Sequence, residues 1–370
     1  MEEALRTLVE LNSFSGNANG ARAVARSLRE HFDIAGLTAE VVPSDLYGEH
    51  LIFCSEGLSS AAPIALLGHL DTVFPPGLFE GYRADGPWRR GPGVYDMKGG
   101  LVVMAWALKA IAATEGLSAI APLRAVIVAD EEVGSPEGAA VIRRTIAGSQ
   151  ACLVFEPGRA NDSIVTQRKG TGSVRAIARG KASHSGNAYW EGANAIWSLA
   201  RFIDAAQQLS SRDAGITVNV GTISGGTSRN TVPAEATAGV DLRYLSADDG
   251  LHLISRLQAL AQTIALPGTT VSIELGPQRP PMPKLDGAQA LIDAYSVAAQ
   301  AFGLGAGEAP LQGGGSDGNT AAGLGIPTID ALGPRGSGFH TPDECIDVTT
   351  LIPRASALVE LLLSRRSTPI

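Results

Sequence analysis

Cysteine is scarce in this chain of 370 residues, which contains three: Cys54, Cys152 and Cys345. An odd number of widely separated cysteines does not make a disulfide framework of the kind that stabilises small secreted proteins. Two of the three lie inside apolar segments. We therefore interpret the cysteines as small buried hydrophobic residues.

Stretches of positive charge are also missing. The chain has 29 Lys and Arg residues against 37 Asp and Glu residues, a formal net charge of −8, and its basic residues form no run or stripe. Binding to nucleic acid or to an anionic membrane surface usually needs such a basic patch. We therefore expect no nucleic-acid partner and no membrane partner, but a small-molecule substrate or ligand.

Long hydrophobic runs are absent as well. The apolar run at residues 101–108 is interrupted by Lys109, whereas a membrane-spanning helix needs about 20 apolar residues. The first residues, Met1, Glu2 and Glu3, form neither a basic nor an apolar segment, so the sequence predicts no secretory signal and a cytoplasmic location.

Glycine, by contrast, is abundant at 44 residues, and hydrophobic residues make up 45% of the chain. This composition is that of a folded globular protein with many tight turns. At about 150 residues per domain, the length predicts two or three domains.

The first part of the chain alternates between strand and helix patterns. Apolar runs at residues 64–67, 123–129 and 151–155 are followed by polar residues, and helical patterns cover residues 99–113 and 138–146. Buried strands that alternate with helices predict an α/β fold with a mainly parallel sheet and helices on both faces. Ligands of such sheets bind beyond the carboxyl ends of the strands, so we expect the chemistry there.

The pattern changes at residues 169–281, where the order is strand, helix, strand, strand, helix, strand. This is the split βαβ order of a ferredoxin-like α+β domain. Helices and strands alternate again afterwards, so we predict that this domain is inserted into a catalytic domain made of residues 1–168 and 282–370. Residues 169–172 are rich in glycine but lack the spacing of a phosphate-binding loop, and we interpret them as a hinge.

His69 and Asp71 follow the first predicted strand. They are two positions apart and therefore face the same side of an extended chain. A carboxylate beside a histidine fixes the ring so that the other ring nitrogen can bind a metal ion. A histidine without any ligand is an equally good interpretation of this pair alone.

Acidic residues also mark the next elements. Asp96 follows a glycine-rich segment and precedes a helical pattern, so taken alone it is best interpreted as a helix N-cap. Asp130, Glu131 and Glu132 come directly after the second predicted strand. Three carboxylates at the end of a buried strand repel one another unless a cation lies among them, which favours a metal site.

Glu156 follows the third predicted strand, and His340, one of six histidines, lies near the C-terminus. Parallel strands end at the same edge of a sheet, so the polar residues at these strand ends converge. Each residue is a weak signal by itself. Their coincidence at one edge predicts a metal site.

These residues lie within longer segments that resemble a known family. The family is that of the dinuclear zinc metallopeptidases and deacylases, which include glutamate carboxypeptidase, acetylornithine deacetylase, succinyl-diaminopimelate desuccinylase and aminoacylase. The sequence is most similar to the glutamate carboxypeptidase branch. The matching segments follow the family's order over nearly the whole chain and are GHLDTV, GPGVYDMKGG, DEEVGS, FEPG, GKASHSG, SRNTVPAEATAGVDLRY, GGGSDGN and GFHTPDE.

The resemblance implies two zinc ions in each subunit, and cobalt or manganese would suit the same ligand types. It implies that one ion binds His69 and Glu156 and that the other binds Glu132 and His340. Asp96 is implied to bridge both ions and is then a ligand at the start of its helix.

The resemblance also implies residues that take part in the reaction. Glu131 is the implied general base, which takes a proton from the water held between the metal ions and returns it to the leaving amine. Asp71 is implied to orient His69, and His184 to polarise the oxygen of the scissile carbonyl group.

A carboxylate of the substrate is implied to bind Asn230 and Arg243. Arg279 and the backbone of Gly314 and Gly315 are weaker candidates for this clamp. An arginine is usually solvated, so these assignments depend on the resemblance.

A serine hydrolase is an alternative that we reject. Residues 314–318 match the nucleophile-elbow pattern around Ser316, and Asp330 and His340 follow in the order used by α/β-hydrolases. However, Ser316 and His340 are too close in sequence for the elements that normally intervene. This alternative also leaves the carboxylates at the strand ends unexplained.

We therefore predict an amidohydrolase that releases a C-terminal glutamate, or a similar amino acid, from an N-acyl amino acid or a peptide. A deacetylase or desuccinylase is the alternative. A non-catalytic binding protein on the same fold is a third, but it would be expected to have lost a ligand or Glu131. The exposed edges of a split βαβ sheet and the resemblance both predict a homodimer through the inserted lid and dimerisation domain, with His184 serving the partner's site.

Overall fold

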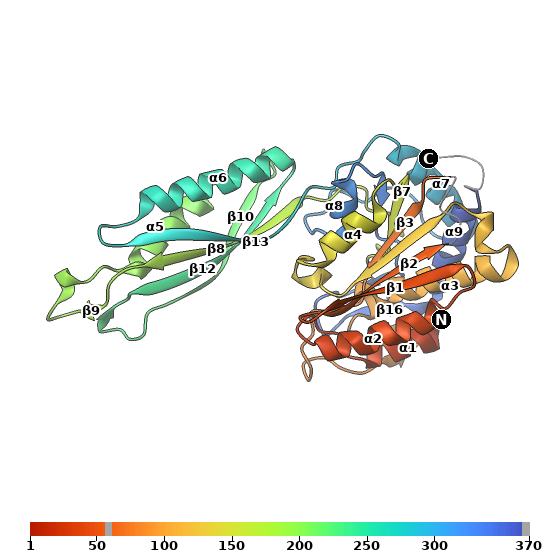
Figure 1. Cartoon of the computed structure of the whole chain (residues 1–370), viewed down its shortest axis with the longest axis horizontal. Helices are drawn as coiled ribbons and strands as arrows, with labels where there is room; N and C mark the ends of the chain where they lie inside the picture. The colour runs from red at the N-terminus through yellow and green to blue at the C-terminus, as the bar shows by residue number, and fades with distance from the viewer. Residues whose placement is uncertain (56–60, 365–370) are drawn as a thin grey trace. The chain divides into compact units, whose positions relative to one another are not determined.

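The computed structural model describes residues 1–55 and 61–364, and the chain divides into two compact units. Unit 1 consists of Met1–Gln167, Met282–Gln312 and the residues from Ser316 onward. Unit 2 consists of Arg168–Pro281 and Gly313–Gly315. Figure 1 shows the helices and strands of each unit.

A six-stranded sheet forms the centre of unit 1, in the order β1-β2-β6-β3-β7-β14. The pairings among β6, β3, β7 and β14 are parallel, whereas β1 and β2 add two antiparallel pairings at one edge. The predicted mainly parallel sheet is therefore confirmed. Its strands are β1 (Leu37–Ser44), β2 (Gly48–Ser55), β3 (Ile64–His69), β6 (Leu123–Val128), β7 (Ala151–Val154) and β14 (Thr328–Ile329).

Helices cover both faces of this sheet. Leu66 of β3 belongs to a large hydrophobic cluster and Leu67 to a smaller one, as expected when successive side chains of a buried strand point to opposite faces. The large cluster includes residues of α1 (Glu2–Glu10), α2 (Ala18–His31), α3 (Gly99–Thr114), α7 (Ala288–Ala301) and α9 (Leu351–Ser364). The smaller cluster includes residues of α4 (Gly138–Ile146) and α8 (Asp317–Ala322).

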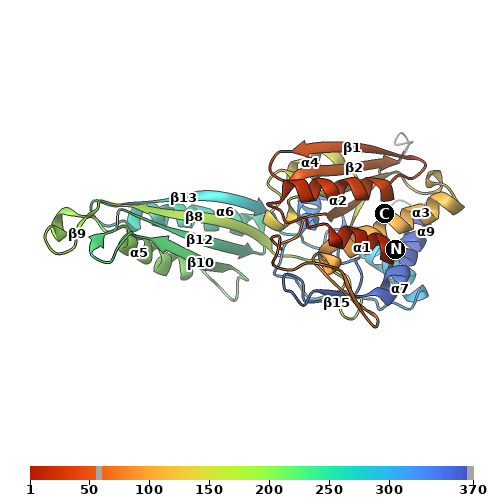
Figure 2. The ribbon, with the colours of Figure 1, turned by 90° about the horizontal axis from the view of Figure 1, so that it is seen from below.

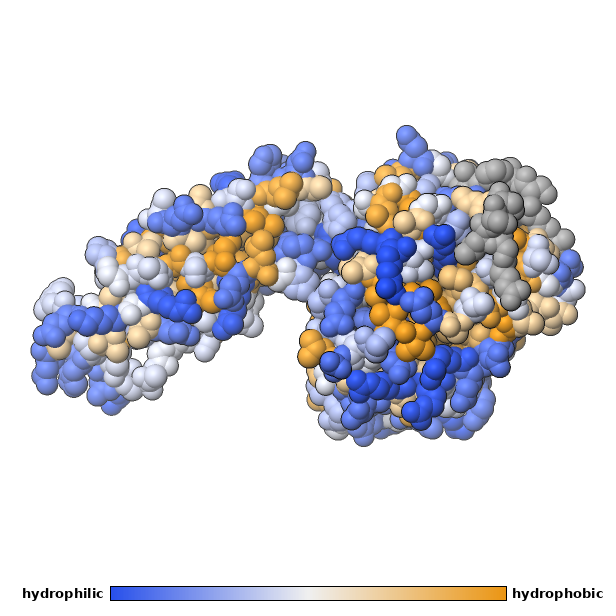
Figure 3. All heavy atoms as spheres, in the orientation of Figure 1, coloured by the Kyte–Doolittle hydropathy of each residue, from blue (hydrophilic) through white to orange (hydrophobic). Residues whose placement is uncertain are grey.

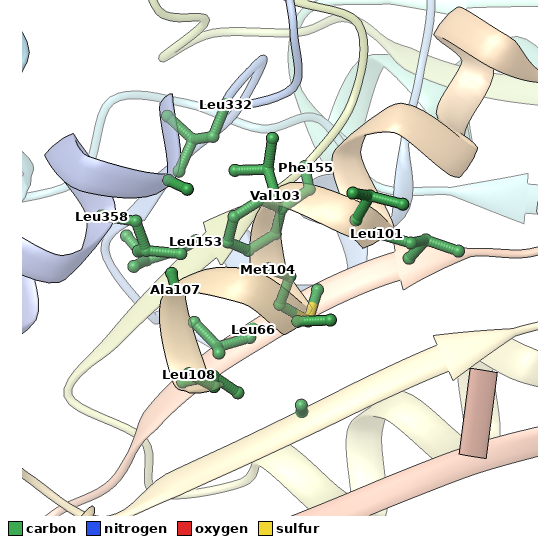
Figure 4. Packing of buried hydrophobic residues seen from close by; sticks show 14 of the residues in the cluster. Leu66, Leu101, Val103, Met104, Ala107, Leu108, Leu153, Phe155, Leu332 and Leu358 are labelled. Atoms are coloured by element: carbon green, nitrogen blue, oxygen red, sulfur yellow. The ribbon is translucent and has the colours of Figure 1, made fainter. Parts of the chain in front are cut away.

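Helix α3 lies in the large cluster, where it packs against α9 and β3. Figure 4 shows Leu101, Met104 and Leu108 of α3 among the apolar side chains that surround them. Among residues 1–55 and 61–364, the stretch Val94–Thr114 is the one helical segment long and apolar enough to cross a membrane, and most of it is buried. Core helices commonly have this length and composition, and α3 is a core helix.

A second, four-stranded sheet of unit 1 was not predicted from the sequence. Its strand order is β15-β16-β5-β4. The pairing of β16 with β5 joins the segment that precedes Asp96 to the segment that follows His340. The strands are β4 (Arg83–Asp85), β5 (Trp88–Arg90), β15 (Gly336–Ser337) and β16 (Cys345–Asp347).

Unit 2 is an antiparallel sheet with helices on one face, as Figure 2 shows. The strand order is β10-β12-β8-β13, which with two helices is the predicted ferredoxin-like arrangement. A separate pair of short strands, β9 and β11, extends the unit. The elements are β8 (Gly170–Arg179), β9 (Ser183–His184), α5 (Ala195–Gln207), β10 (Thr217–Gly225), β11 (Thr231–Val232), β12 (Glu235–Tyr244), α6 (Ala247–Ile264) and β13 (Thr270–Arg279).

The predicted hinge at residues 169–172 is wrong, because β8 already begins at Gly170. Gly170 and Gly172 pair with Tyr244 and Leu242 of β12. A Cβ atom at Gly170 would clash with the ring of Tyr244, at 2.2 Å from its nearest atom. The glycine at this position is therefore explained by side-chain packing within a strand.

Candidate metal centre

His69 is the last residue of β3 and is almost completely buried. Its Nδ1 atom lies 3.0 Å from the carbonyl oxygen of Asp71 and 3.4 Å from the Oδ1 atom of the same residue. These contacts hold one ring nitrogen, as the spacing of the two residues suggested. The other nitrogen, Nε2, lies 3.1 Å from Oδ1 of Asp96.

Asp96 lies between two histidines. Its Oδ1 atom faces His69, and its Oδ2 atom lies 3.3 Å from Nε2 of His340. The N-cap interpretation of Asp96 is wrong, because α3 begins at Gly99 with Lys98 at the cap position and no side-chain capping bond. Each carboxylate oxygen of Asp96 therefore faces a different imidazole, which is the arrangement needed to bridge two cations.

Glu132 and Glu156 complete the two halves of the cluster. Oε2 of Glu132 lies 3.1 Å from Nε2 of His340, and Oε1 of Glu156 lies 3.7 Å from Nε2 of His69. The other oxygen of Glu132, Oε1, is buried and has no hydrogen-bond partner among the described residues. A buried oxygen without a donor costs free energy unless a cation binds it.

The electrostatics of the cluster point the same way. Burial raises the pKa of Glu132 to about 8, with the nearby charge of Asp96 as a further cause, and burial raises the pKa of Glu156 well above its usual value. Hydrogen bonds with Asp96 and Glu132 raise the pKa of His340 to about 10. Carboxylates crowded in this way ionise at a cost that bound divalent cations would remove, and the mixed nitrogen and oxygen donors suit zinc, cobalt or manganese.

Glu131 lies beside the same cluster and is buried. One carboxylate oxygen of Glu131, one of Glu156 and a ring nitrogen of His69 all lie within 4.8 Å of one another, as do ligand atoms of His69, Asp96 and Glu132. The distances alone fit a ligand as well as a general base, so the catalytic role of Glu131 stays a prediction.

Asp71 does more than contact His69. Its Oδ1 atom accepts a hydrogen bond from the backbone N–H of Glu131, and its Oδ2 atom accepts one from the N–H of Glu132, both at 3.1 Å. The hydroxyl of Ser15 donates to Oδ2 at 2.7 Å. Asp71 therefore ties the end of β3 to the loop after β6. The role of Ser15 was not predictable from the sequence, since nothing local marks a serine 56 positions away from its partner.

His184 lies in β9 of unit 2 and is exposed. Its Nδ1 atom accepts backbone hydrogen bonds from Gly186 and Asn187, both at 3.1 Å. A neutral imidazole whose Nδ1 accepts carries its proton on Nε2. His184 is thus a hydrogen-bond donor through Nε2, which is the form needed to polarise a carbonyl oxygen.

Asn230 lies close to His184, because its carbonyl oxygen accepts the N–H of Ser185 at 3.0 Å and Thr231 pairs with His184. Arg243 lies near the opposite end of β12 (Glu235–Tyr244), and the strand extends about 26 Å from Glu235 to Arg243 at 3.3 Å per residue. The two residues predicted to clamp the same carboxylate therefore do not meet within one copy of unit 2.

Arg243 lies beside the other predicted substrate-binding residues. Its guanidinium forms two hydrogen bonds of 2.8 Å with the carboxylate of Asp241, and its Nη1 atom donates to the carbonyl oxygen of Gly313 at 3.3 Å. A Cβ atom at Gly315 would lie 3.5 Å from Cδ of Arg279, so this glycine contacts the second arginine.

A third arginine at this place, Arg168, was not predicted. Its Nη1 atom donates to the carbonyl oxygen of Gly314 at 3.1 Å. The arginine cluster, defined as Arg168, Arg243 and Arg279, therefore surrounds residues 313–315. Arg168 lies outside the segments that carried the resemblance, so the sequence offered no signal for it.

Ser316 has the contacts of a helix cap. It is fully buried, its hydroxyl donates to Oδ2 of Asp330 at 2.7 Å, and it accepts the N–H of Gly318 at the start of α8. His340 contacts Asp96 and Glu132 instead. The rejected serine-hydrolase arrangement has no support in these contacts.

The chain is similar to known proteins over most of its length. A family model described as Peptidase family M20/M25/M40 matches residues 65–364. Carboxypeptidase G2 of Pseudomonas sp. (strain RS-16) is 27% identical over 367 residues, which cover 98% of this chain and 88% of that protein. Acetylornithine deacetylase of Myxococcus xanthus is 30% identical over 221 residues, which cover 56% of each protein.

Solved structures share the fold. The M20 family metallo-carboxypeptidase Sso-CP2 from Sulfolobus solfataricus superposes with a TM-score of 0.81, covers 99% of both chains and is 16% identical in sequence. At this identity the likeness shows a common fold and says nothing about the substrate.

Proposed function

The chain belongs to peptidase family M20/M25/M40, and from this premise we propose that it is a dinuclear metal-dependent amidohydrolase that releases a C-terminal glutamate or a similar amino acid. The substrate would be an N-acyl amino acid or a peptide. The observation that carries the proposal is the position of Asp96, whose two oxygens face His69 and His340 separately. The proposed ligands are His69 and Glu156 for one ion and Glu132 and His340 for the other, with zinc as the proposed metal.

The proposed chemistry is attack of water on an amide carbonyl carbon, followed by breakage of the C–N bond. Two divalent ions in the site would polarise the water molecule and the carbonyl group. Glu131 takes a proton from the water and delivers it to the nitrogen of the leaving amine. Asp71 supports this step because it binds the backbone N–H of Glu131 and so fixes the start of the loop that carries the base.

Unit 2 supplies the proposed contacts with the substrate. His184 would donate its Nε2 proton to the carbonyl oxygen, on which negative charge develops during the attack. Arg243 and Arg279 would bind the free carboxylate of the amino acid, and Arg243 is held for this purpose by Asp241. Charge-assisted hydrogen bonds of this type are among the stronger polar contacts in proteins.

A homodimer would bring the two ends of unit 2 to the same substrate. His184 and Asn230 lie at one end of the unit and the arginine cluster at the other, so we propose that His184 and Asn230 come from the partner subunit. Hydrophobic residues reach the surface of unit 2, some of them visible in Figure 3, and they include Trp190 at 92% exposure. The outer strands β10 and β13 leave two sheet edges available for pairing.

The choice of glutamate rests on the similarity to the glutamate carboxypeptidase branch and to carboxypeptidase G2. The similarity to an acetylornithine deacetylase supports the alternative of an N-deacylase on the same centre. Both reactions hydrolyse an amide bond beside a free carboxylate, and their substrates differ in the side chain of the amino acid and in the acyl group.

A substrate panel tests the proposal. The protein would be treated with a chelator, reloaded with zinc, cobalt or manganese, and assayed on N-acyl glutamate, aspartate, ornithine and alanine. We expect no turnover after chelation, recovery with metal, and the highest kcat/KM on glutamate. Highest activity on the ornithine compound would establish the deacylase alternative, and metal-independent turnover or none at all would overturn the proposal.

A further inference from the structure

Glu344 is fully buried and contacts the loop that carries Asp96. Its Oε1 atom accepts backbone hydrogen bonds from Tyr95 at 2.8 Å and from Asp96 at 2.9 Å. Its Oε2 atom accepts the N–H of Gly93 at 3.1 Å. One carboxylate thus accepts hydrogen bonds from three N–H groups of a single turn. One of these groups, the N–H of Asp96, belongs to the proposed bridging ligand itself.

The same residue is connected to His340 through hydrogen-bonded turns of the backbone. Within the turn, the N–H of Glu344 donates to the carbonyl oxygen of Thr341 at 3.1 Å, and the N–H of Thr341 donates to that of Gly338 at 3.0 Å. Gly338 has a φ of 76°, and a Cβ atom there would lie 2.8 Å from the carbonyl carbon of Asp343. This turn therefore fixes the position of Glu344 relative to His340.

We propose that Glu344 is a positioning residue that connects the Asp96 loop to the His340 loop. This connection, the lock, fixes the relative positions of the ligands in the Glu132–His340 half of the centre. The inference rests on the proposed dinuclear centre and deepens it. Glu344 contacts no proposed ligand atom, but it fixes the backbone of one ligand and lies on the same turn as another. The distance between Oδ2 of Asp96 and Nε2 of His340, 3.3 Å, depends on this connection.

The carboxylate group of Glu344 suits this role better than a neutral acceptor would. Hydrogen bonds that a carboxylate accepts from backbone N–H groups are stronger than those of a neutral acceptor. In Glu344→Gln, the amide oxygen can still accept two of the three N–H groups, but the amide nitrogen then faces the third donor. Partners that orient metal ligands typically contribute 10–100-fold to metal affinity.

The test is titration of the metal-free protein. Binding of zinc alone is measured by calorimetry, and binding of cobalt alone is measured by visible absorption. We expect the wild type to bind two zinc ions. Glu344→Gln should weaken the affinity for the ion of the Glu132–His340 half by about 10–100-fold, while the affinity for the other ion changes less than about threefold. The matched control is Asp343→Asn, because this neighbouring side chain is 91% exposed and, within the described part of the chain, forms an ion pair with Arg90 alone, at 3.8 Å. This control should bind both ions as the wild type does.

A second background tests the connection to His340. In His340→Ala the affected half of the centre is already lost, so Glu344→Gln should change the remaining zinc affinity by less than about threefold. An equal loss in both backgrounds would show that Glu344 acts on Asp96 alone and would overturn the lock.

Other outcomes are also decisive. A wild type that binds fewer than two ions overturns the proposed centre, whereas a wild type with two ions and an unaffected Glu344→Gln variant overturns this inference only. Thermal unfolding of the metal-free variants shows whether they fold. If Glu344→Gln does not fold, Glu344→Asp, which is too short to hold all three N–H groups, takes its place, and failure of both to fold would assign Glu344 to folding and overturn the inference.

Discussion

Glu131 and Glu132 are neighbours in sequence but have different surroundings. They lie in a short 3-10 turn, Glu131–Val133, in the loop after β6, and Asp71 binds the backbone N–H of each. The carboxylate of Glu132 faces His340, whereas that of Glu131 lies with His69 and Glu156. Adjacent residues of a turn point in different directions, so one can bind metal while the other is left to move a proton.

We predict that Glu131→Gln keeps both metal ions and loses most turnover. The amide cannot accept a proton, and removal of a general base typically costs about 10²–10⁴-fold in kcat. Metal analysis and kcat on the best substrate of the panel would be measured together. The control is Glu137→Gln, a partly exposed carboxylate of the same loop, which should retain activity. A collapse of metal content in Glu131→Gln would identify Glu131 as a ligand.

We also predict that Arg243→Ala damages the hydrolysis of substrates with a free carboxylate. The charge-assisted bond that is lost is worth about 1.5–3 kcal/mol, or roughly 10- to 150-fold in kcat/KM. The matched control is Arg175→Ala, an exposed arginine of the neighbouring strand β8 with a 4.0 Å ion pair to Glu274. Unchanged kcat/KM on every active substrate would remove Arg243 from the binding site.

At the level of elements, the ends of the parallel strands were predictable from the sequence. His69 ends β3, Glu131 follows β6 and Glu156 follows β7, and adjacent parallel strands place these residues together. His340 could not be placed in this way, since it lies in a turn outside the main sheet. The resemblance assigned it to a particular ion, and metal binding by all five residues stays a prediction.

The sequence did not predict the elements that lack a regular pattern of buried hydrophobic residues. Strand β1 (Leu37–Ser44) is largely exposed along its length, so its sequence shows neither a buried run nor a regular alternation. The three-residue strands β4 and β5 are too short to show a period at all. In β8, Gly170, which makes room for Tyr244, and Gly172, which makes room for Gln278, looked like a hinge. Tertiary packing, which local patterns do not record, decides each of these cases.

Gly100 allows α3 to approach the end of β7 closely, and a substitution there tests how much this approach matters. A Cβ atom on this helical residue would lie 2.0 Å from the carbonyl oxygen of Phe155, directly before Glu156. We predict that Gly100→Ala forces the helix away from the strand end, lowers the free energy of unfolding by about 1–3 kcal/mol and weakens zinc binding. Denaturant unfolding of the metal-free protein and zinc titration would measure the two effects.

The control for Gly100 is Ala113→Leu, which adds a larger side chain at an exposed position of the same helix. It should leave both stability and zinc affinity close to those of the wild type. An unchanged unfolding free energy in Gly100→Ala would show that the contact between α3 and Phe155 relaxes without cost and does not position Glu156.

On the scale of the whole molecule, the proposed reaction needs groups that a single unit 2 keeps apart. His184 carries its proton on Nε2 and is exposed, while the arginine cluster lies at the opposite end of the four-stranded sheet. A closed twofold assembly through unit 2 would present His184 of one subunit to the centre of the other. Catalysis would then depend on the dimer rather than on the single chain.

Co-expression of His184→Ala with Glu131→Ala tests this dependence. Each variant alone should be inactive as a homodimer, but a mixed dimer that acts in trans has one intact site. Random pairing makes about half of the dimers mixed, with one good site of two, so roughly a quarter of wild-type activity should return. Purified mixed dimers, isolated by two different affinity tags, would be assayed against separately expressed variants combined just before the measurement. Mixed dimers without recovered activity would show that His184 acts within its own chain or takes no part in the reaction.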